Sequence, residues 1–280
     1  MRRLLITDLD GTLAPLHEPL PADAVALLTE LACAGVRIAV VTGCSVRGIL
    51  RRVPARFGER GAGIDWYANN GGSCFRIRPD GTVEYEFDRS EEYARYRSDV
   101  HRELDDWTAA NNCGPLRFAP GESAPDRRVS LDEKECQTTI TLPGLPVLRQ
   151  RLVVELGQRL RDRHGSTLTV RAAGLRSVDV GLATASKHDA VEHLLLKSTL
   201  RGTDVVVAGD SFGPGGADRQ LLHPLLPGGL VLCAGPNAPP ARRGFKIRAL
   251  TGPAEVRSFL RAHYLSPEQL LDPAREVVSD

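Results

Sequence analysis

Lysine is scarce in this sequence: of 36 basic residues only four are lysines, at positions 134, 187, 197 and 246. The formal net charge is +1, so no overall field draws the chain to nucleic acid or to an anionic membrane. Apolar runs are short as well, and none approaches the roughly 20 residues that a membrane-spanning helix needs. We therefore expect neither a nucleic-acid nor a membrane partner, and the sequence leaves the oligomeric state open.

Zinc-binding and disulfide patterns are also missing. The six cysteines form no CxxC pair, and no histidine cluster lies near them at zinc spacing. Small apolar thiols kept reduced are typical of a cytoplasmic protein. The one early apolar run, Leu4 to Ile6, is cut off by Asp8 and Asp10, so we expect no signal peptide and a cytoplasmic location.

The length allows more than one domain. A chain of 280 residues with 42% hydrophobic and 25% charged residues is typical of a globular protein with two domains of ordinary size. The glycine-rich loop at 213–216 lacks a following Gly-Lys-Ser/Thr, so it predicts a flexible turn rather than a nucleotide-binding loop.

Apolar segments near both ends predict a parallel sheet. Residues 3–7 and 36–41 are expected to be buried strands, joined by an amphipathic helix that Pro21 opens. A strand, a helix and a strand within about 40 residues indicate a right-handed parallel crossover. Two later segments, 204–209 and 229–234, repeat the strand pattern.

The middle of the chain has a different pattern. It predicts a hairpin, then a helix, a strand, a second helix and two more strands, which is an α+β arrangement. These elements are expected at 73–78 with 82–87, from Ser90 to Trp107, at 137–142, from Leu145 to Leu160, and at 167–171 and 177–180.

This change of pattern predicts an inserted domain. We expect a Rossmann-like α/β core with a parallel central sheet, formed by residues 1–79 and 176–266. An α+β insert would occupy 80–175, and 267–280 would be a polar tail.

Two acidic residues follow the first strand. Asp8 and Asp10 alternate with Leu9, and the carboxyl end of a parallel strand is where ligands bind in such sheets. Unpaired carboxylates in that crevice would repel each other, so they favour a cation such as Mg²⁺, which takes oxygen ligands. The alternative for this pattern alone is a pair of surface acids in a turn.

Three other regions carry polar residues at equivalent places. Thr42 follows the second strand and offers a hydroxyl and a backbone amide to a phosphate oxygen. Lys187 follows Ser186, a helix N-cap, where its positive charge opposes the helix dipole unless an anion lies between them. Asp210 and Asp218 come after the late strand. Taken singly, these could be an ordinary strand-end threonine and a solvated lysine.

In this order the residues resemble the haloacid dehalogenase superfamily of phosphohydrolases. The four motifs are DLDGT at 8–12, VVTG at 40–43, Lys187, and GDSFGPGGAD at 209–218. The insert lies between the second and third motifs, where this superfamily carries its larger α/β cap. The family's last motif usually places its second acid four or five residues after the first, whereas Asp218 lies eight after Asp210.

The resemblance implies a mechanism. Asp8 would attack phosphorus and form an aspartyl-phosphate, and Asp10 would act as general acid and then general base. The Asp8 and Asp210 side chains and the Asp10 backbone carbonyl would hold Mg²⁺, with Asp218 as a further candidate. Residues expected to bind the phosphate are Asp8, Gly11, Thr42, Gly43 and Lys187.

The insert offers a less specific indication of substrate. Residues 130–140 look like the cap of sucrose-phosphate and trehalose-phosphate phosphatases and Cof-type sugar phosphatases, which implies that Glu133 and Lys134 bind sugar hydroxyls. Asn70 lies in a segment that borders the active site in this family. The trehalose-phosphate pattern continues with His-Tyr-Arg, where this chain has residues 142–144 as Leu-Pro-Gly. A sugar, disaccharide or cyclitol phosphate is expected; the alternative is a charged, exposed strand edge.

Three other functions fit parts of the pattern. A phosphomutase would share all four motifs and keep the phosphate on an isomerised product. A nucleotide-sugar glycosyltransferase also uses a DxD metal motif, normally after a nucleotide-binding region, whereas only seven residues precede Asp8. A catalytically silent phosphosugar-binding regulator would bind its ligand without turnover.

Overall fold

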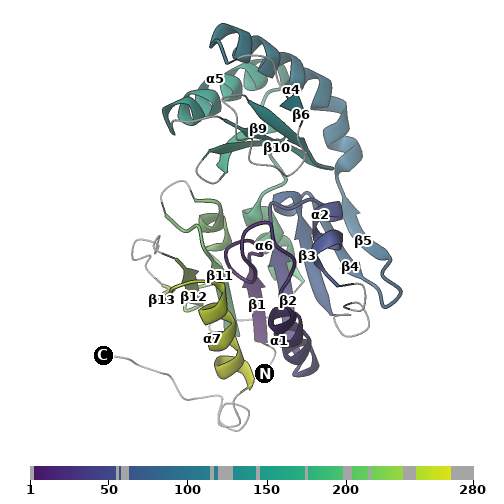
Figure 1. The fold of residues 1–280 in the computed structure, drawn as a ribbon, viewed down its shortest axis with the longest axis vertical. Coiled ribbons are helices and arrows are strands. Elements are labelled where there is room, and N and C mark those ends of the chain that lie inside the picture. Colours follow the sequence, from purple (N-terminus) through teal and green to yellow (C-terminus); the bar gives the residue numbers. More distant parts are fainter. Residues whose placement is uncertain are drawn as a thin grey trace.

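The computed structural model describes ten stretches of the chain, which form two separate sheets (Figure 1). The described residues are 3–54, 57, 63–113, 117–118, 129–142, 146–173, 176–197, 204–213, 216–235 and 244–265. The larger sheet is made from both ends of the sequence, and the smaller sheet is made from its middle.

The larger sheet has eight strands in the order β13-β12-β11-β1-β2-β3-β4-β5. The six strands from β13 to β3 run parallel, while β4 and β5 are antiparallel to their neighbours. Their bounds are β1 Arg3–Thr7, β2 Val36–Val41, β3 Ile64–Ala68, β4 Ser73–Ile77, β5 Val83–Asp88, β11 Val205–Gly209, β12 Leu230–Ala234 and β13 Lys246–Leu250. The expected parallel α/β core is confirmed, with β1 near the middle of the sheet.

Helices cover both faces of this sheet, because its strands are apolar on both sides. On β1, Leu5 packs with residues of α1 (Ala22–Cys33) and α7 (Pro253–Leu265), together with α2 (Val46–Arg52). Leu4 and Ile6 point to the other face, where α6 (Lys187–Leu196) and the 3₁₀ turn η3 (Ala217–Leu221) pack. The result is a three-layer sandwich that holds the strand ends rigidly.

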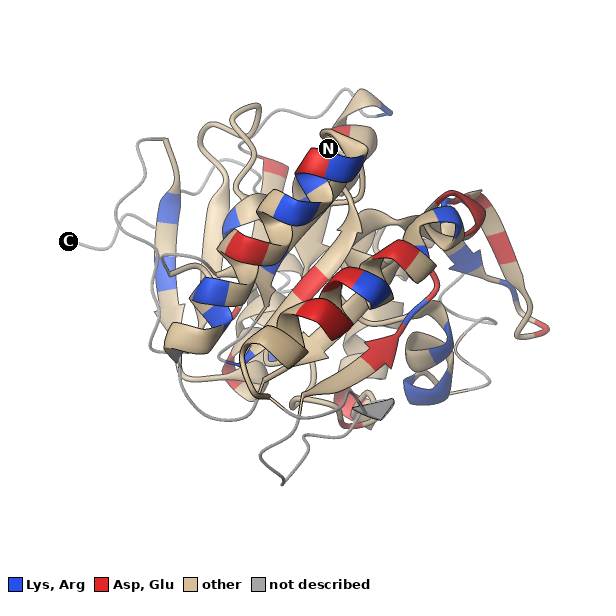
Figure 2. Ribbon diagram, turned by 90° about the horizontal axis from the view of Figure 1, so that it is seen from above, with Lys and Arg blue, Asp and Glu red and all other residues tan. Residues whose placement is uncertain are grey.

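The smaller sheet has the order β6-β7-β8-β10-β9, and one of its faces is covered by two long helices. The strands are β6 Arg117–Phe118, β7 Ser130–Glu133, β8 Gln137–Thr141, β9 Leu168–Ala173 and β10 Ser177–Leu182. The helices are α4 (Ser90–Ala110) and α5 (Pro146–His164). Acidic residues outnumber arginines on α4, and arginines outnumber acidic residues on α5. Figure 2 shows charges of both signs along the helices. Glu103 pairs with Arg163 at 2.7 Å across them, so their charges complement each other.

Among the described residues, no helix has both the length and the apolar character needed to cross a membrane.

The chain passes from the larger sheet to the smaller one, and back again, at positions that differ from the expected domain bounds of 80 and 175. Strand β5 falls inside the expected insert but is the outer strand of the larger sheet. It joins that sheet by pairing with β4, which in turn pairs with β3, a buried strand that was not predicted. Strand β10, expected in the core, pairs with β8 and β9 in the smaller sheet. The tail at 267–280 lies outside the described residues.

Candidate active site

The strand ends bring three predicted site residues to one edge of the larger sheet. In the register of the sheet, Thr7 lies opposite Val40 of β2 and Ala208 of β11, so the residues that follow all three strands lie side by side. Asp8 comes directly after β1, and its backbone N–H donates to the carbonyl of Ala208 at 2.9 Å. Thr42 and Asp210 follow the two neighbouring strands.

Lys187 reaches this edge from the first turn of α6. Ser186 is the N-cap and accepts a hydrogen bond from the backbone N–H of Asp189, as the sequence predicted. The Lys187 Nζ atom lies 2.9 Å from Asp8 Oδ1 and 2.7 Å from Asp218 Oδ1. All three side chains are buried, so the ammonium is the counter-charge for two carboxylates at once.

Asp218 belongs to the same cluster despite its unusual spacing. Its Oδ2 atom accepts the backbone N–H groups of Asp210 and Ser211, each at 2.9 Å. Gly209 allows this approach, since a Cβ there would lie 2.6 Å from Asp218 Oδ2. Burial opposes the charged form, but Lys187 and the Ser211 N–H outweigh it, and they hold the pKa of Asp218 below its ordinary value.

The cluster carries more negative than positive charge. Carboxylate oxygens of Asp8, Asp210 and Asp218 lie within 4.8 Å of one another, with Lys187 between two of them. Burial, together with the neighbouring acids, raises the pKa of Asp8 to about 8 and that of Asp210 to about 7. A hard divalent cation would remove this cost, and an all-oxygen donor set suits Mg²⁺.

Gly11 makes room for the cluster. It has a φ of +72°, and a Cβ at this position would lie 2.2 Å from Asp210 Oδ2. Any larger residue would therefore be strained and would also displace the carboxylate. The DGT motif thus positions Asp210 as well as supplying Asp10.

Asp10 is turned away from the three carboxylates and is held by Arg52. The Arg52 Nη1 atom, on α2, lies 2.8 Å from Asp10 Oδ1 and 2.9 Å from Asp10 Oδ2. The same carboxylate accepts the backbone N–H of His17 at 2.9 Å. Arg52 also donates from Nε to the carbonyl of Glu18, which fixes its guanidinium. Arg52 was not predicted, because it lies ten residues past Thr42 on a short helix that was not predicted either.

Thr42 differs in one detail from expectation. The backbone N–H of Thr42 donates to the carbonyl of Tyr67 at 2.9 Å, so the expected amide contact with phosphate is wrong. The reason is that this N–H completes the pairing between β2 and β3. The hydroxyl oxygen of Thr42 accepts the N–H of Cys44. Its O–H can still donate to a phosphate oxygen.

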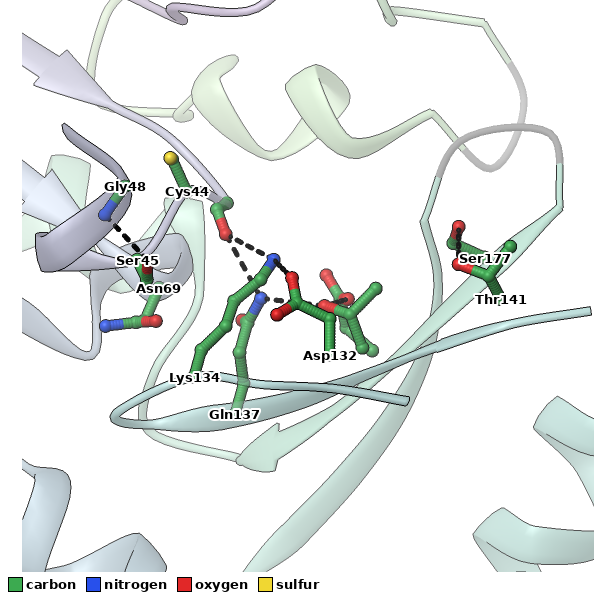
Figure 3. A network of polar contacts seen from close by, with 12 residues as sticks. Cys44, Ser45, Gly48, Asn69, Asp132, Lys134, Gln137, Thr141 and Ser177 are labelled. Atoms are coloured by element: carbon green, nitrogen blue, oxygen red, sulfur yellow. Dashed lines mark hydrogen bonds and ion pairs between the residues drawn. The ribbon is translucent and has the colours of Figure 1, made fainter. Parts of the chain in front are cut away.

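Two side chains at the end of the smaller sheet contact the backbone of Gly43 (Figure 3): Lys134, in the loop between β7 and β8, and Gln137, the first residue of β8. Lys134 Nζ donates to the Gly43 carbonyl at 2.9 Å, and Gln137 Nε2 donates to the same oxygen at 3.3 Å. Asn70 donates from Nδ2 to Gln137 Oε1 at 2.9 Å and to Asp179 Oδ2 at 3.0 Å. Lys134 and Asn70, two of the three expected substrate-binding residues, therefore lie between the two sheets.

Glu133, the third, lies on the opposite face of the smaller sheet. It pairs with Arg97 at 3.0 Å and with His101, both on α4. Side chains alternate along a strand, so Glu133 shares the helix-covered face with Leu131. This parity places Asp132 on the open face, and the expected pairing of Glu133 with Lys134 at one site is not what the structure shows.

A row of polar residues crosses that open face. In the strand register Asp132 lies opposite Thr139, Thr139 opposite Asp179, and Asp179 opposite Arg171. Thr139 donates to Asp179 Oδ1 at 2.7 Å. Asp132, Asp179 and Arg171 were not predicted; the two-residue alternation of the strands on which they lie, β7, β10 and β9, is the signal that could have revealed them.

Comparisons with known proteins support the fold at low sequence identity. Neither protein-family models nor curated proteins show a match to this sequence. Among solved structures, the C-terminal domain of trehalose-6-phosphate phosphatase from C. albicans has a TM-score of 0.63 at 16% identity, covering 94% of this chain and 92% of that one. Sucrose-phosphatase from Synechocystis, in complex with sucrose and phosphate, has a TM-score of 0.56 at 19% identity, covering 95% and 100%.

A third similar structure is that of a nucleotidase. IMP-bound IMP-nucleotidase from Plasmodium falciparum has a TM-score of 0.60 at 12% identity, covering 93% of this chain and 68% of that one. The chain therefore shares the fold of these three structures, a Rossmann-like α/β core with a second, smaller sheet.

Proposed function

We propose that this protein is a Mg²⁺-dependent phosphomonoester hydrolase that passes the phosphoryl group through Asp8. The observation that carries the proposal is the buried contact of Lys187 with both Asp8 and Asp218, next to Asp210, at the carboxyl edge of the parallel sheet. A nucleophilic carboxylate, a fixed ammonium and a cluster of oxygen ligands are the groups that phosphoryl transfer requires.

The three acidic residues of the cluster have two different roles: Asp8 and Asp210 are proposed metal ligands, and Asp218 is a positioning residue. The Asp8 and Asp210 carboxylates and the Asp10 backbone carbonyl would hold Mg²⁺, which neutralises charge on the phosphate when bound. Both oxygens of Asp218 already bind Lys187 or backbone N–H groups. We therefore assign Asp218 the task of orienting Lys187 and the Asp210 backbone rather than direct metal binding.

The steps follow from the positions of the side chains. An Asp8 carboxylate oxygen attacks phosphorus, the bond to the substrate alkoxide breaks, and Asp10 gives that alkoxide a proton. Asp10 then takes a proton from the water that hydrolyses the aspartyl-phosphate. Lys187 and the Thr42 hydroxyl bind the equatorial phosphate oxygens, where charge gathers in the transition state. Arg52 keeps its ion pair with Asp10 and positions that carboxylate for proton transfer.

The substrate is proposed to be a small phosphorylated polyol: a sugar, disaccharide or cyclitol phosphate. Supporting this, the middle part of the chain, which we propose is an inserted cap, presents Asp132, Thr139 and Asp179 toward the core as hydrogen-bond acceptors and donors. Lys134 and Asn70 lie beside them. Hydroxyl groups are the natural partners of such a face.

The six free cysteines support a reducing compartment such as the cytoplasm.

A phosphate-release screen tests this function. Purified protein with Mg²⁺ is given p-nitrophenyl phosphate and a panel of sugar, disaccharide, cyclitol and nucleoside monophosphates. We expect release that EDTA abolishes, that Asp8→Asn loses, and that is fastest with one of the polyol phosphates. An isomerised product that keeps its phosphate would identify a phosphomutase, and binding of a nucleoside-diphosphate sugar without release would favour a glycosyltransferase.

A further inference from the structure

A second group of metal-ligating side chains lies on the α6 face of the larger sheet, apart from the acidic cluster. Cys74 on β4, Glu86 on β5 and His193 on α6 bring a thiol, a carboxylate and an imidazole within 4.8 Å of one another. Cys74 is buried, His193 is half-buried and Glu86 is exposed at the sheet edge. These residues are 12 and 107 positions apart in the chain, so sequence spacing did not reveal them.

A β-bulge turns Glu86 toward the other two. The register of β4 and β5 shifts between Cys74 and Phe75: Cys74 pairs with Phe87, whereas Phe75 pairs with Tyr85. Glu86 is therefore the extra residue of β5. Bulges re-aim side chains in this way, and here the bulge lets Glu86 and Phe87 both approach the α6 side.

The spacing suits tetrahedral zinc. The His193 Nε2 atom lies 3.2 Å from Glu86 Oε1, and Cys74 Sγ lies 3.8 Å from Glu86 Oε2. Zinc bonds are about 2.0 Å long to nitrogen and oxygen and about 2.3 Å long to sulfur. In a tetrahedral site, a nitrogen ligand and an oxygen ligand are therefore about 3.3 Å apart, and a sulfur ligand and an oxygen ligand are about 3.5 Å apart. The two observed distances end on different oxygens of Glu86, and each lies within about 0.3 Å of the corresponding tetrahedral value.

The histidine is oriented by a residue behind it. The Tyr67 hydroxyl lies 2.9 Å from His193 Nδ1, and the Tyr67 and Phe87 rings pack against the imidazole edge to face. A ligating histidine in proteins normally has its other ring nitrogen hydrogen-bonded in this way.

We propose that Cys74, Glu86 and His193 form a Zn²⁺ site that fastens α6 to the β4–β5 hairpin. Without metal, the His193 proton sits on Nε2 and is donated to Glu86, and Lys197 contacts the same carboxylate. On binding, the Cys74 thiol loses its proton to solvent, and the imidazole proton moves to Nδ1 to face Tyr67. Lys197 leaves Glu86, and a water completes the tetrahedron. Thiolate and imidazole ligands favour zinc over the Mg²⁺ of the acidic cluster.

Cobalt titration tests the site independently of any phosphatase activity. Metal-free full-length protein, with excess Mg²⁺ to occupy the acidic cluster, is titrated with Co²⁺ while the thiolate-to-cobalt charge-transfer band is recorded. We expect one equivalent to produce the band, Zn²⁺ to abolish it, and one proton to be released per metal. Cys74→Ser should remove the band, whereas Cys136→Ser and Cys233→Ser, which change two other buried cysteines, should retain it.

Further variants separate ligation from folding. Tyr67→Phe removes the hydroxyl that orients His193, and we expect it to lower the affinity for Co²⁺ about tenfold. His193→Gln removes a ligand but keeps the thiol, and it should lower the affinity by at least as much. Lys197→Gln should tighten binding, since it removes the cation that competes for Glu86. No band in folded wild-type protein, or a band that persists in Cys74→Ser, would overturn the proposal. Circular dichroism of each variant shows that it is folded.

Discussion

The ammonium of Lys187 lies 2.9 Å from the carboxylate of Asp8, and side-chain exposure is only 4% and 9% respectively. These residues are far apart in sequence and meet because β1 and α6 belong to one three-layer core. Burial by itself would lower the pKa of Lys187, but Asp218 and Asp8 reverse this and raise it. The ammonium of Lys187 therefore stays charged in the interior, where it depends on Asp218 and Asp8 as its acidic partners.

Replacing Lys187 tests that dependence. Lys187→Gln leaves Asp8 and Asp218 buried without their cation, which in other proteins costs about 3–5 kcal/mol. We expect a corresponding loss in the free energy of unfolding, measured by urea denaturation without metal, and loss of phosphate release. Part of the stability should return on adding Mg²⁺, which replaces some of the missing positive charge.

Lys197→Gln is the matched control. Lys197 is the C-cap residue of the same helix and is 41% exposed. Its replacement should change the free energy of unfolding by less than about 1 kcal/mol, as for other exposed ion pairs. Equal destabilisation by both substitutions would show that the buried position of Lys187 has no special electrostatic role.

Arg52 should affect proton transfer through Asp10. Arg52→Gln removes the ion pair that orients this carboxylate, and Arg52→Lys keeps a charge without the planar geometry. We expect Arg52→Gln to reduce kcat for an alkyl phosphate more than for p-nitrophenyl phosphate, because a phenolate needs less protonation. Arg52→Lys should be intermediate. Asp10→Asn should show the same selectivity with a larger loss, about 10²–10⁴-fold on the alkyl ester.

Equal losses on the two substrates in Arg52→Gln would contradict this positioning role. A purely structural effect would lower both rates together and would appear in the unfolding curve. Measuring both esters on the same preparation separates these outcomes.

The raised pKa values of Asp8 and Asp210 predict how stability varies with pH in the absence of metal. Each carboxyl binds a proton more tightly in the folded protein than in the unfolded chain, where its pKa is near 3.8. Their favourable contribution is therefore complete below about pH 4 and is lost as pH rises through about 7 and 8. In EDTA, the wild type should be less stable at about pH 9 than at about pH 6, by thermal unfolding, and Mg²⁺ should reduce this difference.

Asp210→Asn isolates one of these groups. Removing a carboxylate from the cluster should stabilise the metal-free protein at high pH by about 0.5–2 kcal/mol and abolish stabilisation by Mg²⁺. An unchanged pH profile in this variant would mean that Asp210 is not part of the electrostatic cost.

The open face of the smaller sheet should control substrate affinity. Asp179→Asn and Lys134→Gln are expected to raise KM for the preferred polyol phosphate by about tenfold or more, because each removes one charge-assisted hydrogen bond. The KM for p-nitrophenyl phosphate, which has no hydroxyl groups to recognise, should change little. Glu133→Gln is the matched control, since Glu133 faces α4, and it should leave both KM values unchanged. A selective effect of Glu133→Gln instead would refute the assignment of faces.

The sequence predicted the core well, because each site residue there follows an apolar strand or a helix cap. Asp8, Thr42, Lys187 and Asp210 meet at one edge as a direct consequence of parallel strand order. The β4–β5 hairpin was harder to place. Strand β5 is largely exposed on both faces, so its pattern does not indicate which sheet it joins; pairing with β4 decides this.

The polar contacts between elements could be predicted least. Arg52 lies on a seven-residue helix whose position depends on packing, and Asp179 acquires its partner Asn70 only when the two sheets meet. Glu133 and Lys134 are neighbours in sequence, but Glu133 ends β7 and faces α4, whereas Lys134 lies in the following loop and donates to the Gly43 carbonyl. Assigning faces needs the register, which residues 130–133 alone are too short to fix.

The most direct test of the account is to trap the phosphorylated enzyme. Protein turning over a substrate with Mg²⁺ is quenched in acid, reduced with borohydride, which converts an acyl phosphate to an alcohol, and mapped by peptide mass spectrometry. We predict that the modified residue is Asp8 alone and that Asp8→Asn neither becomes modified nor releases phosphate. Phosphate release at the wild-type rate from Asp8→Asn, or modification at a different residue, would contradict the central claim.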